Sequence, residues 1–251
     1  MRVQYCSDLH LEFEQNSRYM AKNPLNVMGD ILILAGDIVP LHDEFFSNPF
    51  FSFISENFRQ TFWIAGNHEF YYNDISDYSQ PFNIKLPGNI SIVNNIEIKY
   101  EGVRFIFSTL WSRISTSNEK IIEQSIADFE CITNSKRRFR SADFNKLHDE
   151  SLRFINSSFN GYRGKTVVVT HHLPSALCNA PAHSISPLND AFCVDLTGFI
   201  ERCNANFWIY GHSHFNQKPL IVGKTLMLTN QLGYVHLNEE TCFKQNAFFS
   251  I

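Results

Sequence analysis

The chain has 251 residues, of which 44% are hydrophobic and 18% are charged. This composition is typical of a soluble globular protein and excludes a disordered chain. The length favours one large domain, 1–251, with a substantial core. A net charge of −4 and a pI of about 6.2 exclude a global positive field that would attract nucleic acid or an anionic membrane.

Secretion and membrane insertion are not expected from the sequence. No apolar run approaches the roughly 20 residues that cross a bilayer, and the first residues lack a secretory apolar region. The six cysteines are scattered without a C-x-x-C pair, which predicts reduced thiols rather than a disulfide framework. We therefore expect a cytoplasmic protein.

Short apolar strands are predicted in the first quarter of the chain, at 2–7, 31–35 and 61–65. The second contains four consecutive large aliphatic residues, which is typical of a strand buried on both faces in an α/β core. The polar stretch 11–29 is expected to loop over the surface, and 41–58 has helical aromatic spacing that Pro49 should interrupt. This order of strands and a helix predicts an α/β fold.

The middle of the chain combines a hairpin pattern with helical stripes. Residues 89–108 alternate apolar and other side chains around a turn at Glu101-Gly102, which predicts a hairpin. Helical stripes cover 118–133 and 143–159, on either side of a basic run at 136–140. We expect this helical segment, 118–159, to border the active site.

The last third of the chain returns to strands. Buried strands are predicted at 165–170 and 207–210, with a helix at 196–203 between them. The loop 173–191 contains three prolines and should lie over whatever site the strand ends build. Short antiparallel strands are predicted at 219–222, 225–228, 234–237 and 247–249.

Side chains that commonly bind metals directly follow five of these strands. They are Asp8 and His10, Asp37, Asn67 with His68, His171, and His212 with His214. Open α/β folds place ligands at the carboxyl ends of strands, and residues two apart on an extended segment share a face. Two divalent ions about 3.5–4 Å apart are a recognised device for phosphoryl hydrolysis. Asp37 ends the most buried strand, so it is the candidate to bridge two ions with its two carboxylate oxygens.

Taken in order, these motifs resemble the calcineurin-like metallophosphoesterase superfamily. The pattern D-x-H, G-D, G-N-H-E/D, H and G-H-x-H is matched in full between residues 8 and 214. The resemblance implies an α/β fold of two packed mixed β-sheets flanked by helices, in four layers. It also implies a metal-ligand set, in which Asp37 bridges a first ion held by Asp8, His10 and His214 and a second held by Asn67, His171 and His212.

The chemistry implied by the resemblance is hydrolysis of a phosphate ester. A water or hydroxide between the ions would attack phosphorus in line. His68 would not bind metal but would protonate the leaving oxygen or stabilise charge on the phosphoryl group, so the catalytic set is His68, Asp37 and Asn67. Manganese, iron, zinc and cobalt all suit this mixture of imidazole and carboxylate ligands.

Departures from the family patterns narrow the substrate class. Ile38-Val39-Pro40 follows the G-D motif, so the aspartate that orients the equivalent of His68 in the protein-phosphatase branch is missing and its orienting partner is open. The lipid-A-pathway branch has arginine in place of His68, which disfavours that substrate. The chain looks closest to small bacterial and phage phosphoesterases, which predicts a small phosphate mono- or diester as substrate.

Two other functions compete with this interpretation. A metal-dependent nuclease is favoured by the basic run 136–140, but the acidic pI and the lack of room for a capping domain oppose it. A non-catalytic metal-binding scaffold would bind partners through the aromatic surface at 45–53, but it would not need His68. No membrane partner is expected, and the oligomeric state is open.

Several further residues are candidates for supporting roles. His172 could donate a hydrogen bond behind a ligand, contact phosphate or pack in a loop, and Glu69 is expected to hydrogen-bond a ligand. Trp111 could reach the phosphate, whereas Arg113 and the basic run are expected to be a surface ion pair and a solvated turn. The segment 230–233 is expected to close one wall of the site, and Cys6 is expected to be a buried core thiol.

Overall fold

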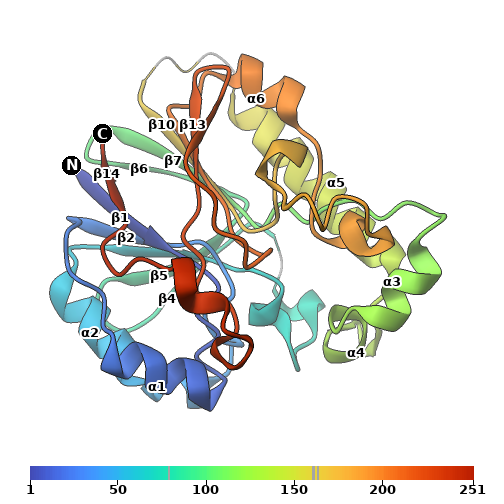
Figure 1. Ribbon diagram of the computed structural model, residues 1–251, viewed down its shortest axis with the longest axis horizontal. Coiled ribbons are helices and arrows are strands. Elements are labelled where there is room, and N and C mark those ends of the chain that lie inside the picture. The colour runs from blue at the N-terminus through green and yellow to red at the C-terminus, as the bar shows by residue number, and fades with distance from the viewer. Residues whose placement is uncertain (79, 160–161, 163) are drawn as a thin grey trace.

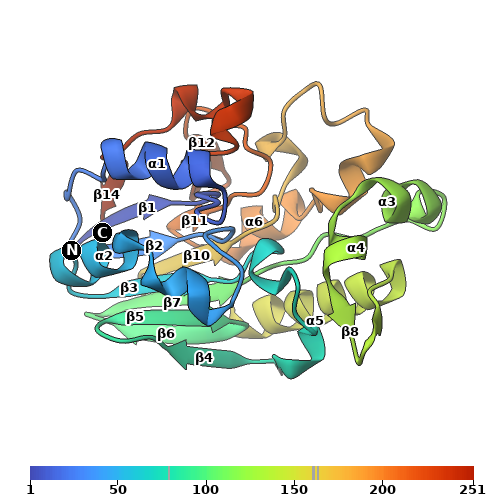
Figure 2. The ribbon, with the colours of Figure 1, turned by 90° about the horizontal axis from the view of Figure 1, so that it is seen from below.

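The computed structural model describes residues 1–78, 80–159, 162 and 164–251. Within these residues, two six-stranded mixed sheets pack face to face, and helices cover their outer faces (Figures 1 and 2). The two chain ends lie side by side, where the amide of Ile251 donates to the carbonyl of Met1 at 3.0 Å. The predicted α/β fold of two packed sheets is confirmed.

The first sheet contains the strands that carry the first three motifs. Its order is β14 (Phe248–Ser250), β1 (Arg2–Cys6), β2 (Ile31–Leu34), β3 (Thr61–Ile64), β5 (Ile90–Asn94) and β4 (Phe82–Lys85). The four central strands β1, β2, β3 and β5 are parallel, and the two edge strands are antiparallel to them. The carboxyl ends of β1, β2 and β3 therefore meet at one edge of the sheet.

The second sheet carries the last two motifs in the same way. Its order is β12 (Leu220–Val222), β13 (Thr225–Leu228), β11 (Phe207–Ile209), β10 (Thr166–Thr170), β7 (Val103–Ser108) and β6 (Ile96–Tyr100). Strands β13, β11, β10 and β7 are parallel, again with antiparallel edges. Each sheet thus contributes adjacent parallel strand ends to the region between the layers.

Successive side chains of each buried strand point alternately into two different apolar layers, as expected for a strand buried on both faces. Ile31 and Ile33 of β2 pack in the apolar layer between the sheets, whereas Leu32 and Leu34 pack beneath the covering helices. In β10, Val167 and Val169 face the layer between the sheets, and the residue between them faces outward. Burial on both faces explains why these strands are continuous apolar runs rather than alternating ones.

Helices form the two outer layers. α1 (Glu14–Lys22) and α2 (Pro49–Asn57) cover the first sheet, and α5 (Ser141–Ser158) and α6 (Thr197–Cys203) cover the second (Figure 1). The short helices α3 (Glu119–Ser125) and α4 (Asp128–Cys131) extend beyond the sheets with one end of α5. Between α4 and α5, β8 (Thr133–Asn134) and β9 (Arg137–Arg138) form a small hairpin.

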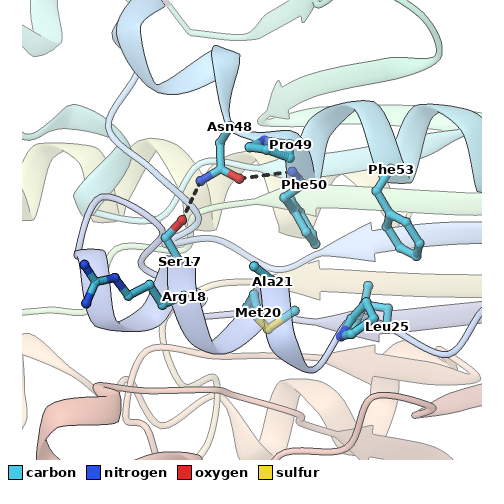
Figure 3. Close-up of a pocket in the computed structure, with 10 residues that line it drawn as sticks. Ser17, Arg18, Met20, Ala21, Leu25, Asn48, Pro49, Phe50 and Phe53 are labelled. Carbon is cyan, nitrogen blue, oxygen red and sulfur yellow. Dashed lines mark hydrogen bonds between the residues drawn. The ribbon is translucent and has the colours of Figure 1, made fainter.

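An apolar groove of about 360 Å³ separates α1 from α2 (Figure 3). Pro49 begins α2, where it needs no amide partner, and Asn48 caps that helix by accepting from the Phe50 amide at 3.0 Å. The Asn48 amide also donates to the Ser17 hydroxyl at 3.0 Å, which fixes the two helices at one end. Pro49 therefore interrupts the predicted helix at 41–58 by starting a new one, and Phe50 and Phe53 line the groove.

Four predicted elements differ from the structure. The loop predicted at 11–29 contains α1, whose buried face consists only of Asn16 and Met20, so its apolar stripe is too weak to recognise. The predicted hairpin at 89–108 is three strands, of which β5 joins the first sheet and only β6 and β7 form a hairpin. The predicted helix at 118–133 divides into α3 and α4, and the predicted strand at 234–237 is a 3-10 turn, Val235–Leu237.

Candidate metal centre

The structure brings all seven predicted ligand residues to one place, where the carboxyl ends of the two sheets meet. Three groups of ligand-type atoms within 4.8 Å of one another occur there among the described residues, namely Asp8–His10–His214, Asp37–His171–His212 and His10–Glu12–His68. We call Asp8, His10 and His214 the first half-site, and Asn67, His171 and His212 the second. Residues of both are buried, and the most exposed side chain, that of His214, is 12% exposed.

The backbone at this edge adopts conformations that ordinary residues rarely take. Five of the seven predicted ligands have left-handed φ angles between 47° and 76°, namely Asp8, His10, Asp37, His212 and His214. Such conformations cost free energy and persist where the surrounding structure enforces them, which is common at functional sites. They turn the chain sharply after each strand, so the side chains point toward one another rather than along the sheet.

The glycines of the motifs allow the strand ends to approach closely. A Cβ atom on Gly66 would lie 2.2 Å from Asp37 Oδ1 and 2.8 Å from His171 Nε2. A Cβ atom on Gly36, whose φ is +91°, would lie 2.4 Å from His171 Nδ1. Any side chain at either position would therefore displace the ligands, which explains the need for glycine in the G-D and G-N-H motifs.

In the first half-site, two imidazole nitrogens face each other. His10 Nε2 and His214 Nε2 lie 3.0 Å apart, and Asp8 Oδ1 is 3.5 Å from His214 Nε2. The other nitrogen of each ring faces a carboxylate, with Glu12 Oε1 3.2 Å from His10 Nδ1 and Glu239 Oε2 2.6 Å from His214 Nδ1. These carboxylates place the ring protons on Nδ1, so two lone pairs point into the same space.

In the second half-site, three acceptor atoms converge. His171 Nδ1 faces the carbonyl of Ala35 at 2.8 Å, which directs its Nε2 toward Asn67 Oδ1 at 3.1 Å and Asp37 Oδ1 at 3.2 Å. The second oxygen of Asp37, Oδ2, lies 3.9 Å from His10 Nε2 of the first half-site. The Asp37 carboxylate thus faces both half-sites, one oxygen to each.

The remaining ligand side chains are oriented by neighbours. The Asn67 amide donates to Asp128 Oδ1 at 2.8 Å, which leaves its carbonyl oxygen directed at the second half-site. The ring of His212 is stacked between His172 and Phe192, at centroid distances of 4.1 and 4.7 Å. Its Nε2 faces the carbonyl of Ala191 at 3.3 Å, so Nδ1 is the nitrogen available to bind a metal ion.

The charges of these groups shift their proton affinities strongly. Burial lowers the pKa of His171, but the Asp37 carboxylate outweighs it and raises that pKa to about 10. Burial raises the pKa of Asp37, yet the His171 and His68 rings hold it well below its usual range. The same oxygens that stabilise a proton on His171 would stabilise a metal cation in its place.

The donor set is one that could hold divalent metal ions. Ligand-type atoms lie 3.0 Å apart in the first half-site and 3.1–3.2 Å apart in the second, so each pair shares either a proton or a metal cation. Imidazole, carboxylate and amide oxygen form a mixed set suited to first-row transition ions. A carboxylate that faces both half-sites is the group that a two-ion centre requires.

His68 lies beside this centre and is directed differently from the ligands. Its backbone amide donates to Asp37 Oδ1 at 3.0 Å, and its ring stacks on Tyr71 at 4.0 Å. The ring Nδ1 faces Glu12 Oε1 at 3.0 Å, and Nε2 faces the Tyr234 hydroxyl at 3.4 Å. Burial lowers the pKa of His68, but Asp37 and Glu12 raise it to about 9.

Two of the supporting residues singled out from the sequence contact the loops that carry ligands. The Glu69 carboxylate accepts from the backbone amides of Asp37, Ile38 and Gly66 at 2.6–2.9 Å, so it holds the backbone of a predicted ligand rather than its side chain. The side-chain oxygen Oε1 of Gln231 accepts from the His214 backbone amide at 2.6 Å, which places the segment 230–233 at one wall as expected.

The other candidates have their contacts outside the two half-sites. Arg113 pairs with Asp149 at 2.7 Å, and both side chains are exposed, as expected for a surface ion pair. Trp111 is buried and packs between Phe70 and Phe144. In the basic run, the guanidinium groups all have partners, which are Asp143 for Arg137, the Phe129 and Glu123 carbonyls for Arg138, and Glu123 for Arg140. Cys6 is a buried thiol, as expected.

His172 is a packed residue behind the second half-site. It is fully buried, its Nδ1 lies 3.3 Å from the Ser112 amide, and its ring stacks on that of His212. Its Nε2 has no hydrogen-bond partner among the described residues. Of the three roles left open by the sequence, the structure shows packing against a predicted ligand.

Four site residues were missed in the sequence, namely Glu12, Asp128, Tyr234 and Glu239. Each touches a predicted ligand or His68 from a loop or short helix. Glu12 carries a weak signal, since it lies two residues after His10 and shares its face. The other three are far in sequence from the groups they contact, so no local pattern identifies them.

The chain belongs to the calcineurin-like phosphoesterase family, which it matches over residues 1–216. An uncharacterised protein of Acanthamoeba polyphaga mimivirus, L509, is 33% identical, with 100% of this chain and 97% of that protein aligned.

Two solved structures share the fold at low sequence identity. Phosphopantetheinyl hydrolase (PptH) from Mycobacterium tuberculosis has a TM-score of 0.69 at 16% identity, covering 97% of this chain and 93% of that one. A dimetal phosphatase from Danio rerio has a TM-score of 0.50 at 13% identity, covering 92% and 87%. Among the described residues, no helix has the length and apolar character needed to span a bilayer.

Proposed function

We propose that the chain uses two divalent metal ions to hydrolyse a small phosphate mono- or diester. The observation that carries this proposal is the arrangement around Asp37, whose two carboxylate oxygens face separate groups of imidazole and amide ligands. In our assignment Asp8, His10 and His214 hold the first ion, Asn67, His171 and His212 hold the second, and Asp37 bridges them. Manganese, iron, zinc and cobalt are the candidate ions.

The chain's own groups divide the work of catalysis. When bound, two such ions would lower the pKa of a water molecule and neutralise charge on the phosphoryl group. His68 would face the leaving oxygen, to which its ring can give a proton, and the nearby Tyr234 hydroxyl would contact the same region. Asn67 and Asp37 would fix the positions of the ions. The Asn67 side-chain amide is held by Asp128, and the Asp37 backbone amide is held by Glu69.

A panel of metals and substrates tests this function. Purified protein should contain about two transition ions per chain, and it should hydrolyse p-nitrophenyl phosphate, its bis-ester or both. His68→Ala should lower turnover by about 10²–10⁴-fold while leaving metal content unchanged, because its ring is placed beside the ions rather than on them. Loss of metal together with turnover would contradict this division of roles.

The same panel separates the competing functions. Short single-stranded DNA tests the nuclease, whose supporting feature is the basic run; the three arginine side chains of this run are engaged in hydrogen bonds and ion pairs within the chain. A phosphopantetheinyl ester is included because PptH shares the fold. A protein that binds two ions but cleaves none of these esters would instead support a scaffold.

The scattered cysteines support a cytoplasmic location.

A further inference from the structure

Glu12 contacts two functional histidines with one carboxylate oxygen. Its Oε1 lies 3.2 Å from His10 Nδ1 and 3.0 Å from His68 Nδ1, and the side chain is 10% exposed. The other oxygen, Oε2, is buried and has no hydrogen-bond partner among the described residues. A carboxylate in this position holds a predicted ligand of the first half-site and the predicted catalytic ring at the same time.

We propose that Glu12 is the positioning residue of His68, and that it ties the orientation of the catalytic ring to the first half-site. This inference rests on the proposed phosphoesterase function. Residues 38–40, Ile-Val-Pro, offer no carboxylate after the G-D motif, so the ring must be oriented from elsewhere. Glu12 reaches it from the loop after β1.

The other contacts of His68 do not fix which ring nitrogen faces the substrate. Stacking on Tyr71, at 4.0 Å and an interplanar angle of 27°, constrains the plane of the ring but is nearly indifferent to a flip within that plane. Asp37 accepts from the backbone amide of His68 and not from its ring. The Glu12 hydrogen bond to Nδ1 removes this ambiguity, and Nε2 is left to face Tyr234 and the substrate side.

Other carboxylates near the ring are already committed. Asp128 accepts from the Asn67 amide and from the Tyr71 hydroxyl, both at 2.8 Å. Glu239 accepts from His214 Nδ1 at 2.6 Å and from the Tyr234 amide at 2.7 Å. Glu239 is therefore a matched control for Glu12, since each stands behind one imidazole of the first half-site, but only Glu12 also contacts His68.

The decisive experiment is a pair of double-mutant cycles measured at saturating metal. Glu12→Ala should lower kcat by about 10–100-fold, as is usual for carboxylates behind functional histidines. In a His68→Ala background the same change should cost less than about threefold, because the ring that it positions is gone. Glu239→Ala should cost the same factor in both backgrounds. An equal loss for Glu12→Ala in both backgrounds would overturn the proposal.

A readout independent of activity accompanies the cycles. In the metal-free full chain, the imidazole N–H of His68 that bonds Glu12 should give a slowly exchanging downfield proton resonance, present in Glu239→Ala and absent in Glu12→Ala. Glu12→Gln keeps an oxygen at the Oε1 position, so it should retain the resonance and recover most of the lost turnover even if the alanine variant folds poorly. Persistence of the resonance in folded Glu12→Ala would refute the contact.

Failure of the positioning proposal is distinguishable from failure of the function. A wild-type chain that loads metal but hydrolyses no ester would remove the function, whatever the resonance shows. An active wild-type chain in which Glu12→Ala and Glu239→Ala behave alike would remove only the role of Glu12.

Discussion

The two half-sites of the candidate metal centre are built from similar ligands but are supported in different ways. In the first, the imidazoles of His10 and His214 are backed by the carboxylates of Glu12 and Glu239. In the second, the rings of His171 and His212 face backbone carbonyls instead. The His214 side chain of the first half-site is 12% exposed, whereas all three residues of the second half-site are buried.

The two half-sites therefore differ in what controls their imidazole ligands, which is carboxylate charge in the first and backbone position in the second. A carboxylate behind an imidazole raises the basicity of the ligand and adds negative charge near the ion, whereas a carbonyl mainly fixes the tautomer and the direction of the ring. Substitution of a side chain can therefore weaken the support of the first half-site. The two histidines of the second half-site are supported by the backbone carbonyls of Ala35 and Ala191, which no side-chain substitution removes.

The largest effect should come from the residue that the half-sites share. Asp37→Ala removes the oxygens that face both, so we expect loss of both ions and a fall in turnover of at least about a thousandfold. Metal analysis and a p-nitrophenyl phosphate assay measure these losses. Retention of either ion at wild-type affinity would show that Asp37 does not bridge.

Removal of one imidazole from each side should separate the half-sites. His214→Ala and His171→Ala should each reduce the metal content from about two ions per chain to about one, with anomalous scattering showing opposite positions vacated. We expect the remaining ion to bind more weakly in His171→Ala, since Asp37 loses its nearest imidazole neighbour. Loss of both ions in either variant would mean that the centre assembles as one unit.

A smaller effect should follow from weakening only the support of the first half-site. Glu239→Gln keeps the shape of the side chain but removes its charge from behind His214, so the affinity of one ion should fall about 10–100-fold. Calorimetric titration of the metal-free chain should show one weakened site and one unchanged site. Equal weakening of both sites would contradict the view that Glu239 supports only the first half-site.

The smallest effect is a pH dependence that His171 of the second half-site shares with His68, whose pKa burial lowers but Asp37 and Glu12 raise to about 9. In the metal-free chain burial lowers the pKa of His171, but Asp37 raises it to about 10, above the ordinary 6.5. Its contribution to stability is therefore fully present below pH 6.5 and is lost as the pH rises toward 10. The Tm of the EDTA-treated chain should fall across this window, and the fall should be reduced in His171→Gln. Burial and the neighbouring His68 lower the pKa of His10, so His10→Gln should leave the fall in place.

The buried strands could be predicted from the sequence because both of their faces are covered. Continuous aliphatic runs such as Ile31–Leu34 have no other stable location in a chain of this length, so they indicate the α/β class directly. Helix α1 could not be predicted in this way, since only Asn16 and Met20 are buried along it. Its position depends on packing against α2 and the first sheet.

The predicted ligands were found for a related reason. A strand that ends at a sheet edge fixes where the next residue lies. The place of a two- or three-residue motif directly after a buried strand can therefore be predicted from the sequence. The sequence by itself therefore determined the buried central strands and the identity of the seven converging side chains. Only the tertiary structure decided which groups stand behind them, because Asp128, Tyr234 and Glu239 reach the site from segments whose positions depend on packing and not on local pattern.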